Sequence, residues 1–581
     1  MIVLGLSGAL DHDPSAALFQ DGELVAAAEE ERFVRDKHAK HFLPEHAARF
    51  CLEFAGIPAS AVDAVAHPFA PIPWRHPGRW HYARRHFYAP DRALAAIFNG
   101  NRRFRRNRRR CFELMRRLGL DPERTPFYPV EHHLAHASSA YHLSGFTGKA
   151  AILGIDGKGE YATTFFGYGE NGVIHRLREF YDPDSLGGLY GAMTEYLGFE
   201  MLDGEFKVMG MAPYGRAGRF DLSPLLTYSA SEFHVNTRLV NVIGTRRYKD
   251  ASGRGKYFSP ALIDWLGPER EGDEIDDPYV DYAAAVQQLL EQAVLGLVQH
   301  YLGSIIRETG RLCFAGGVAL NVKLNQRIMG LPGLKELFVQ PAASDAGTAV
   351  GAASYVAHSL GDLIRPLRHV YLGPAYSTEQ CEEACRRHVE KPQWEKISGP
   401  AALGARILAA GHPLAWFQGR MEFGPRALGN RSILGHPGLR GVADLINAQI
   451  KYRERWRPFC PSILDRVAPD IIQSEHPAPY MTFTFTVNPA WRDRIPEVVH
   501  EDGTARVQIV EKSSNPLYFQ LLEELERLTG AGVVLNTSLN RRGEPMVCSP
   551  DDALDMFFGS DLRYLMLENI LVRKPDAPRP F

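Results

Sequence analysis

Residues 150–157, Ala-Ala-Ile-Leu-Gly-Ile-Asp-Gly, are typical of a buried β-strand that runs into a glycine turn. An aromatic and β-branched run follows at 163–169, and a second apolar run, Val-Ile-His-Arg-Leu, begins directly after Asn171-Gly172. Asn-Gly between two such runs is a strong hairpin signal, because both residues accept the positive φ of a tight type I′ turn. This stretch therefore predicts a strand, a glycine turn and a hairpin in direct succession.

The same succession opens the chain. Residues 2–8, Ile-Val-Leu-Gly-Leu-Ser-Gly, lead to Ser-Ala-Ala-Leu-Phe-Gln at 15–20, then to Asp21-Gly22 and a second apolar run. An internal repeat of this kind is informative about the whole fold. It is the plan of the duplicated actin-like ATPase fold, in which each half opens with a hairpin whose turn can face nucleotide phosphates. We therefore expect two α/β halves of the same topology in this part of the chain.

Two histidines at helical spacing precede the second copy of the repeat. His132 and His136 lie four residues apart in Glu-His-His-Leu-Ala-His, so a helix would place both imidazoles on one face. Asp156 ends the next strand, and Asp345 stands at the start of a helix predicted at 344–359. Two imidazoles and carboxylates are typical of a catalytic metal site. The alternatives are that the histidines are ordinary core or surface side chains and that Asp345 is a helix cap.

Two glycine-rich segments lie further along this part of the chain. A predicted strand runs into Gly316 and Gly317, whose backbone can approach a flat base or ribose closely, and Asn321 can hydrogen-bond the same group. Residues 203–215, which include Lys207, are rich in glycine and bulky side chains. We predict that they form an ordered active-site loop.

Composition restricts the class of protein. A chain of 581 residues is too long for one ordinary core, so two or three domains are expected. The net charge of −2 gives no overall attraction to nucleic acid or to a membrane. There is no stretch of about 18 or more apolar residues, and because the first predicted strand begins at Ile2, we expect no cleavable leader. The seven scattered cysteines are typical of a reducing compartment, so we expect a cytoplasmic protein without a membrane partner.

An arginine-rich segment separates the two halves of the repeat. Residues 73–117 include Asn-Arg-Arg-Phe-Arg-Arg-Asn-Arg-Arg-Arg at 101–110, with aromatic side chains interleaved around this run. A run of like charge is usually a solvated face. The aromatic residues also allow an edge that receives substrate, or a surface for an acidic partner or RNA.

The pattern changes to α+β beyond Pro366. Arginine and lysine residues are embedded here among Phe, Pro, Leu and Trp, and they stand next to Gly, Asn, Ser and Thr. Guanidinium forks and small hydroxyl or amide groups are what phosphate oxygens require. We therefore expect this part to bind a phosphorylated ligand rather than to expose its arginines to water.

Taken together, the motifs resemble those of ATP-dependent O-carbamoyltransferases, the family that includes nodulation-factor, cephem, ansamycin and tobramycin carbamoyltransferases. The match covers nearly the whole chain in the family's order, and the segment 73–117 departs from it. The motifs that carry the resemblance are His-Asp-Pro-Ser-Ala from His12, Glu-Glu-Glu-Arg-Phe from Glu29 with Lys37-His38, His-His-Leu-Ala-His, Ile-Asp-Gly, Phe-Lys-Val-Met-Gly-Met-Ala-Pro-Tyr-Gly, Gly-Gly-Val-Ala-Leu-Asn, Ser-Asp-Ala-Gly-Thr-Ala, Glu-Phe-Gly-Pro-Arg-Ala-Leu-Gly-Asn-Arg-Ser and Asn-Thr-Ser-Leu-Asn.

The resemblance implies a fold and a reaction. It implies a duplicated actin-like (ASKHA) domain at 1–365, with the insert at about 73–117, followed by a YrdC-like domain at 366–581. The second domain would form carbamoyl-adenylate from carbamoyl phosphate and ATP with Mg²⁺. The first would transfer the carbamoyl group to a hydroxyl of a small natural product, as in antibiotic biosynthesis and other secondary metabolism. Fe²⁺ is the expected metal of the first domain, with Mn²⁺ and Zn²⁺ as alternatives.

The resemblance also assigns roles to individual residues. The assigned residues are His12 and Lys37 as catalytic base and charge stabiliser; His132, His136, Asp156 and Asp345 as metal ligands; Lys207, Gly316, Gly317 and Asn321 for adenosine; and Arg426, Lys451, Arg457, Arg506, Asn536 and Ser538 for carbamoyl phosphate and ATP. Two rival functions are a tRNA threonylcarbamoyl transferase, for which the insert would bind RNA, and a non-catalytic nucleotide-binding scaffold. The identity of the acceptor and the oligomeric state are not indicated by the sequence.

Overall fold

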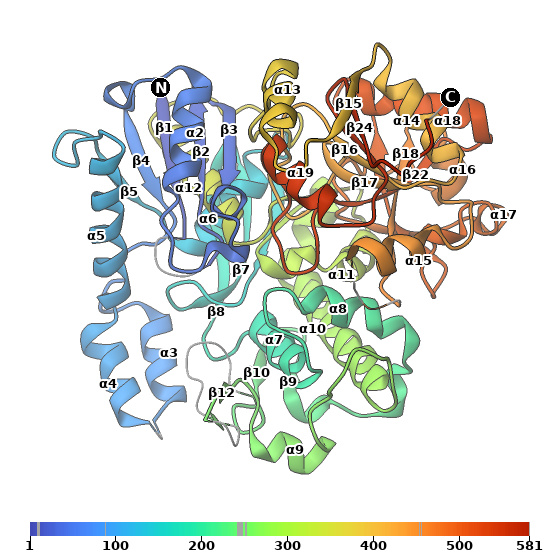
Figure 1. Cartoon of the computed structure of the whole chain (residues 1–581). Coiled ribbons are helices and arrows are strands. Elements are labelled where there is room, and N and C mark those ends of the chain that lie inside the picture. The colour runs from blue at the N-terminus through green and yellow to red at the C-terminus, as the bar shows by residue number, and fades with distance from the viewer. Residues whose placement is uncertain are drawn as a thin grey trace. The chain divides into compact units, whose positions relative to one another are not determined.

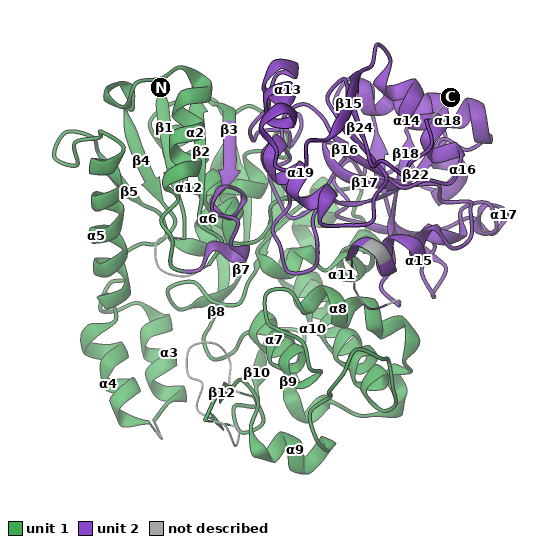
Figure 2. Cartoon of the chain, viewed as in Figure 1, with its two compact units in different colours: residues 1–25, 41–367 green, residues 26–40, 368–581 purple. Residues whose placement is uncertain are grey.

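The chain divides into two compact units. The structure, a computed structural model, describes residues 1–8, 12–87, 89–240, 248–249, 253–451, 454 and 456–579. The first unit consists of residues 1–25 and 41–367, and the second of residues 26–40 and 368–581 (Figures 1 and 2). The division after residue 367 lies close to the boundary predicted after residue 365. Residues 26–40, which the sequence places in the first domain, group with the second unit.

The first unit contains two five-stranded sheets of the same topology, with strand orders β3-β2-β1-β4-β5 and β8-β7-β6-β13-β14. In each sheet the opening strands pair antiparallel, and the third, fourth and fifth strands of the order just given pair in parallel. The strands are β1 (Ile2–Leu6), β2 (Ser15–Gln20), β3 (Glu23–Glu29), β4 (Ala64–His67), β5 (Phe127–Pro129), β6 (Ala150–Ile155), β7 (Ala162–Glu170), β8 (Val173–Tyr181), β13 (Arg311–Ala315) and β14 (Glu336–Val339). The predicted repeat is confirmed, and the unit has the duplicated actin-like plan.

Both predicted hairpin turns are present. Asp21 and Gly22 have φ values of 50° and 76°, and Asn171 and Gly172 have φ values of 51° and 82°. Positive φ at both central residues matches the right-handed twist of the flanking strands, and Asp, Asn and Gly tolerate this conformation best. The two turns therefore set the register of both hairpins in the same way.

Two helices join the halves of the first unit. Helix α6 (His132–Tyr141) contacts β6, β7 and β13, helix α12 (Thr348–Ser359) contacts β1, β2 and β4, and the two helices contact each other. A Cβ at Gly351 of α12 would meet the Ala135 carbonyl oxygen of α6 at 1.8 Å. A Cβ at Gly5 of β1 would meet the Ala349 carbonyl oxygen at 2.1 Å. Glycine is therefore required for the close approach of these backbones, which draws the starts of α6 and α12 together.

Helix α10 (Tyr279–Thr309) runs through the first unit and ends at Gly310, which has a φ of 73°. In the part of the chain that the structure describes, it is the one helix long and apolar enough to cross a membrane. Of its most apolar window, 56% is buried inside the protein, as in a core helix. The other elements of this region are α2 (Glu45–Ala55), α7 (Leu186–Tyr196), α8 (Glu205–Met211), α9 (Pro260–Leu266), α11 (Val322–Met329), β9 (Leu226–Tyr228), β10 (Phe233–Val235), β11 (Tyr248–Lys249) and β12 (Gly255–Lys256).

The predicted active-site loop at 203–215 is wrong in its local structure. Residues Glu205–Met211 form helix α8, and Ala212–Tyr214 continue as a short 3₁₀ turn. Glu, Lys and Met are good helix formers, and Val208, Met209 and Met211 are buried. Burial of this apolar side outweighs the helix-weakening effect of the glycine within the run.

The arginine-rich insert forms three helices, α3 (Pro77–Arg85), α4 (Pro90–Asn99) and α5 (Arg102–Arg117), with α3 and α4 side by side (Figure 1). Helix α3 is anchored on Asp184, whose side chain is 2% exposed. His81 Nε2 and Arg85 Nη2 of α3, together with His234 Nδ1 of β10, each lie 3.0 Å from a carboxylate oxygen of Asp184. Asp184 is thus one buried anchor of the insert, and Arg110 of α5 adds another contact, because its Nη2 donates to the His41 carbonyl oxygen at 2.8 Å.

The second unit is built on a mixed eight-stranded sheet of order β15-β24-β23-β16-β17-β22-β18-β21. The strands are β15 (Gln393–Lys396), β16 (Leu414–Phe417), β17 (Arg431–Gly435), β18 (Cys460–Leu464), β21 (Gln508–Val510), β22 (Val533–Ser538), β23 (Tyr564–Leu567) and β24 (Ile570–Arg573), with β19 (Thr484–Thr486) and β20 (Thr504–Arg506) as a separate hairpin. The helices are α1 (Glu31–Val34), α13 (Thr378–Arg387), α14 (Pro400–Ala409), α15 (Val442–Ile446), α16 (Ala468–Ile472), α17 (Pro489–Arg492), α18 (Pro516–Thr529) and α19 (Pro550–Phe558). This mixed α/β architecture fits the predicted YrdC-like class.

Candidate functional sites

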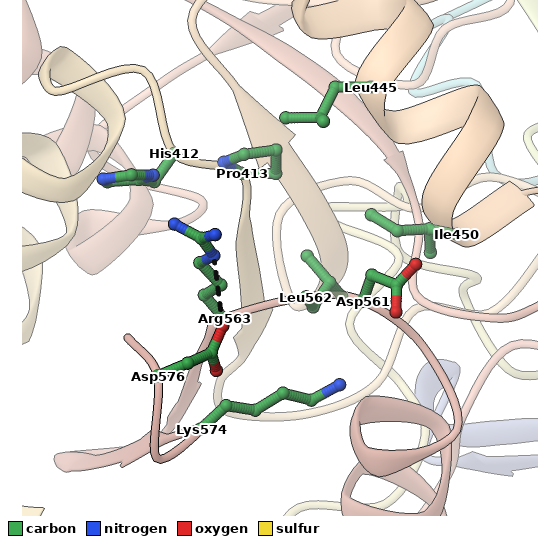
Figure 3. Close-up of a pocket in the computed structure, with 9 residues that line it drawn as sticks. All are labelled: His412, Pro413, Leu445, Ile450, Asp561, Leu562, Arg563, Lys574 and Asp576. Atoms are coloured by element: carbon green, nitrogen blue, oxygen red, sulfur yellow. Dashed lines mark ion pairs between the residues drawn. The ribbon is translucent and has the colours of Figure 1, made fainter. Parts of the chain in front are cut away.

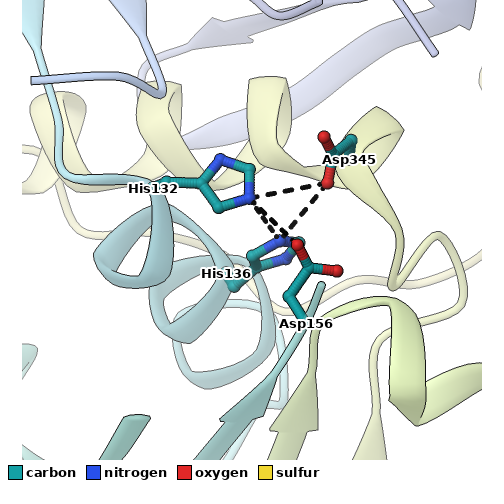
Figure 4. A group of neighbouring side chains, drawn as sticks. All are labelled: His132, His136, Asp156 and Asp345. Atoms are coloured by element: carbon teal, nitrogen blue, oxygen red, sulfur yellow. Dashed lines mark hydrogen bonds and ion pairs between the residues drawn. The ribbon is translucent and has the colours of Figure 1, made fainter. Parts of the chain in front are cut away.

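Four side chains of the first unit converge on one point (Figure 4). His132 and His136 project from α6, Asp156 directly follows β6, and Asp345 begins the 3₁₀ turn Asp345–Gly347 that leads into α12. One ligand atom from each residue lies within 4.8 Å of every other. The structure thus brings together the four predicted metal ligands, which we call the histidine–aspartate cluster, from both halves of the repeat.

The distances within this cluster suit a single cation. Nε2 of His132 lies 3.1 Å from Nε2 of His136, 3.4 Å from Oδ2 of Asp156 and 3.5 Å from Oδ1 of Asp345. Two imidazole nitrogens and two carboxylate oxygens form a donor set that suits iron, manganese or zinc. Asp345 is not the cap of α12, because α12 begins at Thr348 and its N-cap position makes no side-chain hydrogen bond. The residues present therefore fit a divalent metal.

His132 is oriented by contacts behind the cluster. Its Nδ1 lies 3.4 Å from the Pro68 carbonyl oxygen, and its backbone N–H donates to both carboxylate oxygens of Glu160 at 3.2 Å. Glu160 also accepts a hydrogen bond from the Ala70 backbone N–H at 2.7 Å. A proton on Nδ1 that faces a carbonyl leaves the Nε2 lone pair directed at the cluster, which is the usual arrangement behind a metal-binding histidine.

The charges within the cluster stabilise one another against burial. Burial lowers the pKa of His132, but the charge of Asp345 and the hydrogen bond with Asp156 raise it well above its ordinary value. Burial raises the pKa of Asp345, but the charge of His132 and its hydrogen bond bring it well below its ordinary value. A divalent cation would stabilise both carboxylates in the same way and would displace the proton from His132. The neighbouring His133 is buried outside the cluster, and burial lowers its pKa to about 3.

The glycine pair after β13 has a structural role beside the cluster. Gly316 has a φ of 95°, and a Cβ there would meet the Ile155 carbonyl oxygen at 2.2 Å. The Gly317 backbone N–H donates to Oδ1 of Asp156 at 2.9 Å, and a Cβ on Gly317 would meet the same oxygen at 2.9 Å. Both glycines are therefore explained by the close approach to the strand end that carries Asp156. Their role toward adenosine stays a prediction.

The two other predicted adenosine residues have structural partners of their own. Asn321 caps α11: its Oδ1 accepts from the Leu324 backbone N–H at 3.0 Å and from Gln287 Nε2 at 3.1 Å. Lys207 lies on α8, with Nζ 5.1 Å from the ring centroid of Phe199. These contacts do not test adenosine binding, but the Asn321 oxygen already accepts two hydrogen bonds.

The two predicted catalytic residues belong to different units. His12 Nδ1 lies 2.9 Å from Oδ2 of Asp13, and the charge of His12 contributes to the lowered pKa of Asp345. His12 is therefore within electrostatic reach of the histidine–aspartate cluster. Lys37 begins the 3₁₀ turn Lys37–Ala39 in the segment that groups with the second unit. The assignment of a shared role to both residues stays a prediction.

Two arginines of the second unit act on the buried guanidinium of a third, Arg426. Burial, followed by the charges of Arg506 and Arg457, holds the pKa of Arg426 well below its ordinary value. Arg506 Nε donates to Sγ of Cys460 at 3.0 Å. We call Arg426, Arg457 and Arg506 the arginine cluster. A bound anion would stabilise these neighbouring positive charges.

The remaining predicted phosphate contacts lie on or beside strand β22. Asn536 is the cross-strand partner of Cys460, and its Nδ2 donates to the Ala427 carbonyl oxygen at 3.1 Å. Two residues further along β22, the Ser538 hydroxyl oxygen lies 3.2 Å from Nζ of Lys451. The strand therefore connects two groups of predicted residues, Asn536 beside the arginine cluster and Ser538 beside Lys451.

Two residues missed by the site prediction organise this region. Asn540 Oδ1 accepts from Lys451 Nζ at 2.8 Å and from the Ser538 hydroxyl at 2.6 Å. Glu422, which is 1% exposed, accepts through Oε1 from the backbone N–H groups of Leu428 and Asn430 at 2.7 and 2.8 Å. Asn540 lies in the same short motif as Ser538, so its position in the sequence was a usable signal. The role of Glu422 depends on a folded loop.

A separate cavity of about 420 Å³ lies in the second unit (Figure 3). It contains none of the six predicted phosphate-binding residues, although its lining residue Ile450 directly precedes Lys451. The cavity is lined by His412, Pro413, Leu445, Ile450, Asp561, Leu562, Arg563, Lys574 and Asp576. The phosphate-binding prediction therefore concerns the arginine cluster and not this cavity.

Comparison with known proteins identifies the family of this chain. Residues 2–354 match the family model of the carbamoyltransferase N-terminus, and residues 405–574 match that of the carbamoyltransferase C-terminus. The chain belongs to the carbamoyltransferase family, and the protein is a transferase of carbamoyl groups.

Its relatives include proteins of bacterial nodulation. An uncharacterised protein of Synechocystis sp. is 36% identical, with 99% of this chain and 97% of its own length covered. Nodulation protein NolNO of Sinorhizobium fredii is 35% identical, with 99% and 83% covered. Nodulation protein NolO of Bradyrhizobium diazoefficiens is 37% identical, with 77% and 79% covered.

Proposed function

We propose that the protein is an ATP-dependent O-carbamoyltransferase with a division of labour between its units. The second unit forms carbamoyl-adenylate, and the first transfers its carbamoyl group to a hydroxyl of a small natural product. The observation that carries the proposal is that each unit has its own charged, buried site. The histidine–aspartate cluster fits a metal, and the arginine cluster fits phosphate oxygens.

In the proposed adenylation step, carbamate is the intermediate between carbamoyl phosphate and carbamoyl-adenylate. Water cleaves carbamoyl phosphate to carbamate and inorganic phosphate, and a carbamate oxygen then attacks the α-phosphorus of ATP. Pyrophosphate leaves with the electron pair of the broken P–O bond, so carbamoyl-adenylate and pyrophosphate are the products. Arg426, Arg457 and Arg506 would neutralise the phosphate oxygens, and their charges would stabilise the negative charge that shifts to pyrophosphate in the transition state.

Residues on β22 and near it would position the phosphates. Asn536 lies 2% exposed beside the arginine cluster, and Oδ1 of Asn536 is a buried atom without a partner among the described residues. Lys451 and Ser538, held together by Asn540, add one cation and one hydroxyl. A flexible ammonium and small polar groups complement the fixed forks of the arginines in holding a polyphosphate with Mg²⁺.

Transfer takes place in the first unit in this proposal. The acceptor hydroxyl attacks the carbamoyl carbon, its proton passes to a base, and AMP leaves as the O-carbamate forms. Bound to His132, His136, Asp156 and Asp345, a divalent metal would supply Lewis acidity toward the carbonyl and phosphate oxygens. His12 is our candidate for the base, because its charge already acts on Asp345. A reactive mixed anhydride is best consumed away from water, so the proposal places both activities in one chain.

The acceptor is expected to be a small molecule. Two relatives are named nodulation proteins, and nodulation factor is one acceptor of the proposed class. We propose a cytoplasmic reaction with a hydroxyl-bearing natural product. The match of residues 2–354 and 405–574 to carbamoyltransferase models favours this class over a tRNA-modifying enzyme. The complete histidine–aspartate and arginine clusters favour an enzyme over a scaffold.

Pyrophosphate exchange tests the proposal. ATP should exchange with labelled pyrophosphate only when carbamoyl phosphate is present, and mass spectrometry with candidate acceptors should show a gain of one carbamoyl group. Exchange without any carbamoylated product would support adenylate formation and would mean that the true acceptor was not among the candidates. If a folded, metal-loaded protein showed neither exchange nor adenylate formation, we would conclude that the chain is a non-catalytic nucleotide-binding scaffold.

A further inference from the structure

The charge of the chain is distributed very unevenly. Residues 73–117 contain fourteen arginines and two carboxylates, a surplus of twelve positive charges. Because the whole chain has a net charge of −2, the remainder has a surplus of fourteen negative charges. The chain average therefore conceals a strongly basic element, and the expectation of no membrane partner rested on that average.

The basic charge is concentrated on the exposed side of α5. Asn107, Cys111, Leu114 and Met115 of this helix are buried. The exposed arginines of its first half, which we call the basic face, are Arg102, Arg105, Arg106, Arg108 and Arg109. Within the described part of the chain, none of these five forms an ion pair. Their charge is thus available to an external anion.

Large apolar side chains are exposed on the neighbouring helices α3 and α4 and on the segment just before α3. Trp74, Trp80, Leu94 and Phe98 are 46%, 43%, 52% and 75% exposed, and we call them the apolar patch. The Trp74 ring centroid lies 5.4 Å from that of Trp80 and 5.8 Å from that of Phe98. Leu94 and Phe98 are four residues apart on α4, so they share one helix face. The patch is therefore contiguous.

The patch and the basic face meet at the junction of α4 and α5. Arg105 Nη2 donates to Oδ1 of Asn99 at 2.5 Å, and Asn99 directly follows Phe98. The exposed side chains of the apolar patch thus adjoin the basic face at Phe98 and Arg105. Exposed large apolar groups bordered by cationic ones mark an interaction surface.

We propose that this surface of the insert docks on an anionic phospholipid bilayer. Tryptophan and phenylalanine would enter the headgroup region with Leu94, and the basic face would be attracted by anionic headgroups. Stable peripheral binding requires two such signals, apolar insertion and a polybasic segment, and the insert supplies both. Tryptophan in particular favours the membrane–water interface, because its ring is large and apolar while its N–H is polar.

The geometry favours a bilayer over single-stranded RNA, the other large polyanion. Base stacking requires parallel, open ring faces. The Trp74 ring is instead at 89° to Trp80 and at 46° to Phe98, and Leu94 offers no ring at all. These side chains can insert between lipid headgroups without any fixed mutual orientation.

Vesicle co-sedimentation of the full chain tests the proposal. The protein should sediment with phosphatidylcholine vesicles that contain phosphatidylserine, and much less with pure phosphatidylcholine. The double variant Leu94→Ser/Phe98→Ser should lower this partitioning about tenfold. The quadruple variant of Arg105, Arg106, Arg108 and Arg109 to Ser should lower it at least about a hundredfold, and high salt should weaken binding of the wild type. Pyrophosphate exchange should be unchanged in both variants, and an unchanged melting temperature and metal content would show that their first unit folds.

Matched substitutions elsewhere provide the control. Leu363 and Val389 are 85% and 83% exposed, and their change to Ser should leave vesicle binding unaltered. Equal loss in this control, no binding of the wild type, or binding that both insert variants retain would overturn the proposal. So would RNA binding that exceeds vesicle binding and depends on the same arginines. A raised acceptor KM in the quadruple variant with unchanged vesicle binding would instead assign the insert to the acceptor.

Discussion

The Nε2 atoms of His132 and His136 face each other at 3.1 Å in a buried site that also contains two carboxylates. One proton between the two nitrogens can hold them together, which agrees with the raised pKa of His132. A divalent cation can replace that proton, because it accepts both lone pairs and balances both carboxylates. We therefore propose that the pair acts as one metal-binding element of the first unit.

Replacement of His136 by Ala should separate the two activities. We expect loss of bound metal, measured by elemental analysis, and loss of acceptor carbamoylation. Pyrophosphate release from ATP and carbamoyl phosphate should stay near the wild-type rate, because the arginine cluster lies in the other unit. His133→Ala removes a buried imidazole from the same helix without removing a ligand, so it should retain the metal. Equal loss of both activities in folded His136→Ala would contradict the assigned division of labour.

Replacement of Arg426 by Met should abolish adenylate formation without weakening the fold. Each charge-assisted contact contributes about 1.5 to 3 kcal/mol to phosphate binding, and more if the contact tightens in the transition state. Methionine keeps most of the volume and removes a buried charge that Arg506 and Arg457 repel. We therefore expect a melting temperature at or above that of the wild type, and little further rise on addition of ATP. A large drop in melting temperature would show that Arg426 is mainly structural.

Replacement of Arg431 by Met provides the contrast from the same motif. Arg431 Nη1 donates to the Gln418 carbonyl oxygen at 2.7 Å, and its guanidinium carbon lies 3.6 Å from the Phe417 ring centroid. Here the substitution leaves buried carbonyl groups without their donor, so we expect a lower melting temperature. If the two variants lost stability equally, the distinction between a binding and a structural arginine would fail.

Replacement of Asp184 by Ala should strongly destabilise the first unit. Its buried carboxylate binds His81, Arg85 and His234, and removal of one partner leaves Arg85 unpaired at a partly buried position. Loss of one member of a buried pair typically costs about 3 to 5 kcal/mol. Chemical denaturation should show this loss, whereas Asp493→Ala, whose side chain is 98% exposed, should change little. Wild-type stability in Asp184→Ala would mean that the insert is anchored elsewhere.

Glu179 should make stability depend on pH. Burial raises its pKa from 4.5 to about 7, against the charge of Arg176. Between these two values the folded protein binds more protons than the unfolded chain, so stability falls as pH rises through this window, on the order of 2 kcal/mol. Glu179→Gln should remove this part of the pH dependence and be more stable relative to wild type at pH 8 than at pH 5. Glu23→Gln, at an exposed pair with Arg365, should keep the wild-type profile.

Local sequence signals predicted much of the first unit. Asp21-Gly22 and Asn171-Gly172 have the positive φ values expected of hairpin turns, and the hairpins start two sheets of the same topology. The spacing of His132 and His136 predicted two imidazoles on one helix face. These features depend on neighbours a few residues apart, for which backbone sterics and helical periodicity suffice.

Other features required contacts that no local pattern specifies. Glu205–Met211 form a helix because the apolar side of the segment is buried. Asn321 caps α11 and pairs with Gln287, more than thirty residues away in the chain. Arg426 and Arg431 belong to one motif and are both buried, yet one joins other arginines and the other binds carbonyl groups. The two arginines lie in the same short motif, so their different roles become visible only in the folded loop.

The sequence by itself determined the repeat, the hairpins, the helix with two histidines and the family motifs, because each follows from residue types at short spacing. The sequence also predicted that Asp156 and Asp345 would join these histidines, but the means is tertiary, since close packing of α6 against α12 at Gly351 brings the strand and helix ends together. The tertiary structure alone decided which arginines of α5 are exposed and that Trp74 and Trp80 of the same insert are exposed. Burial and charge proximity are properties of three-dimensional neighbours, and a linear pattern does not contain them.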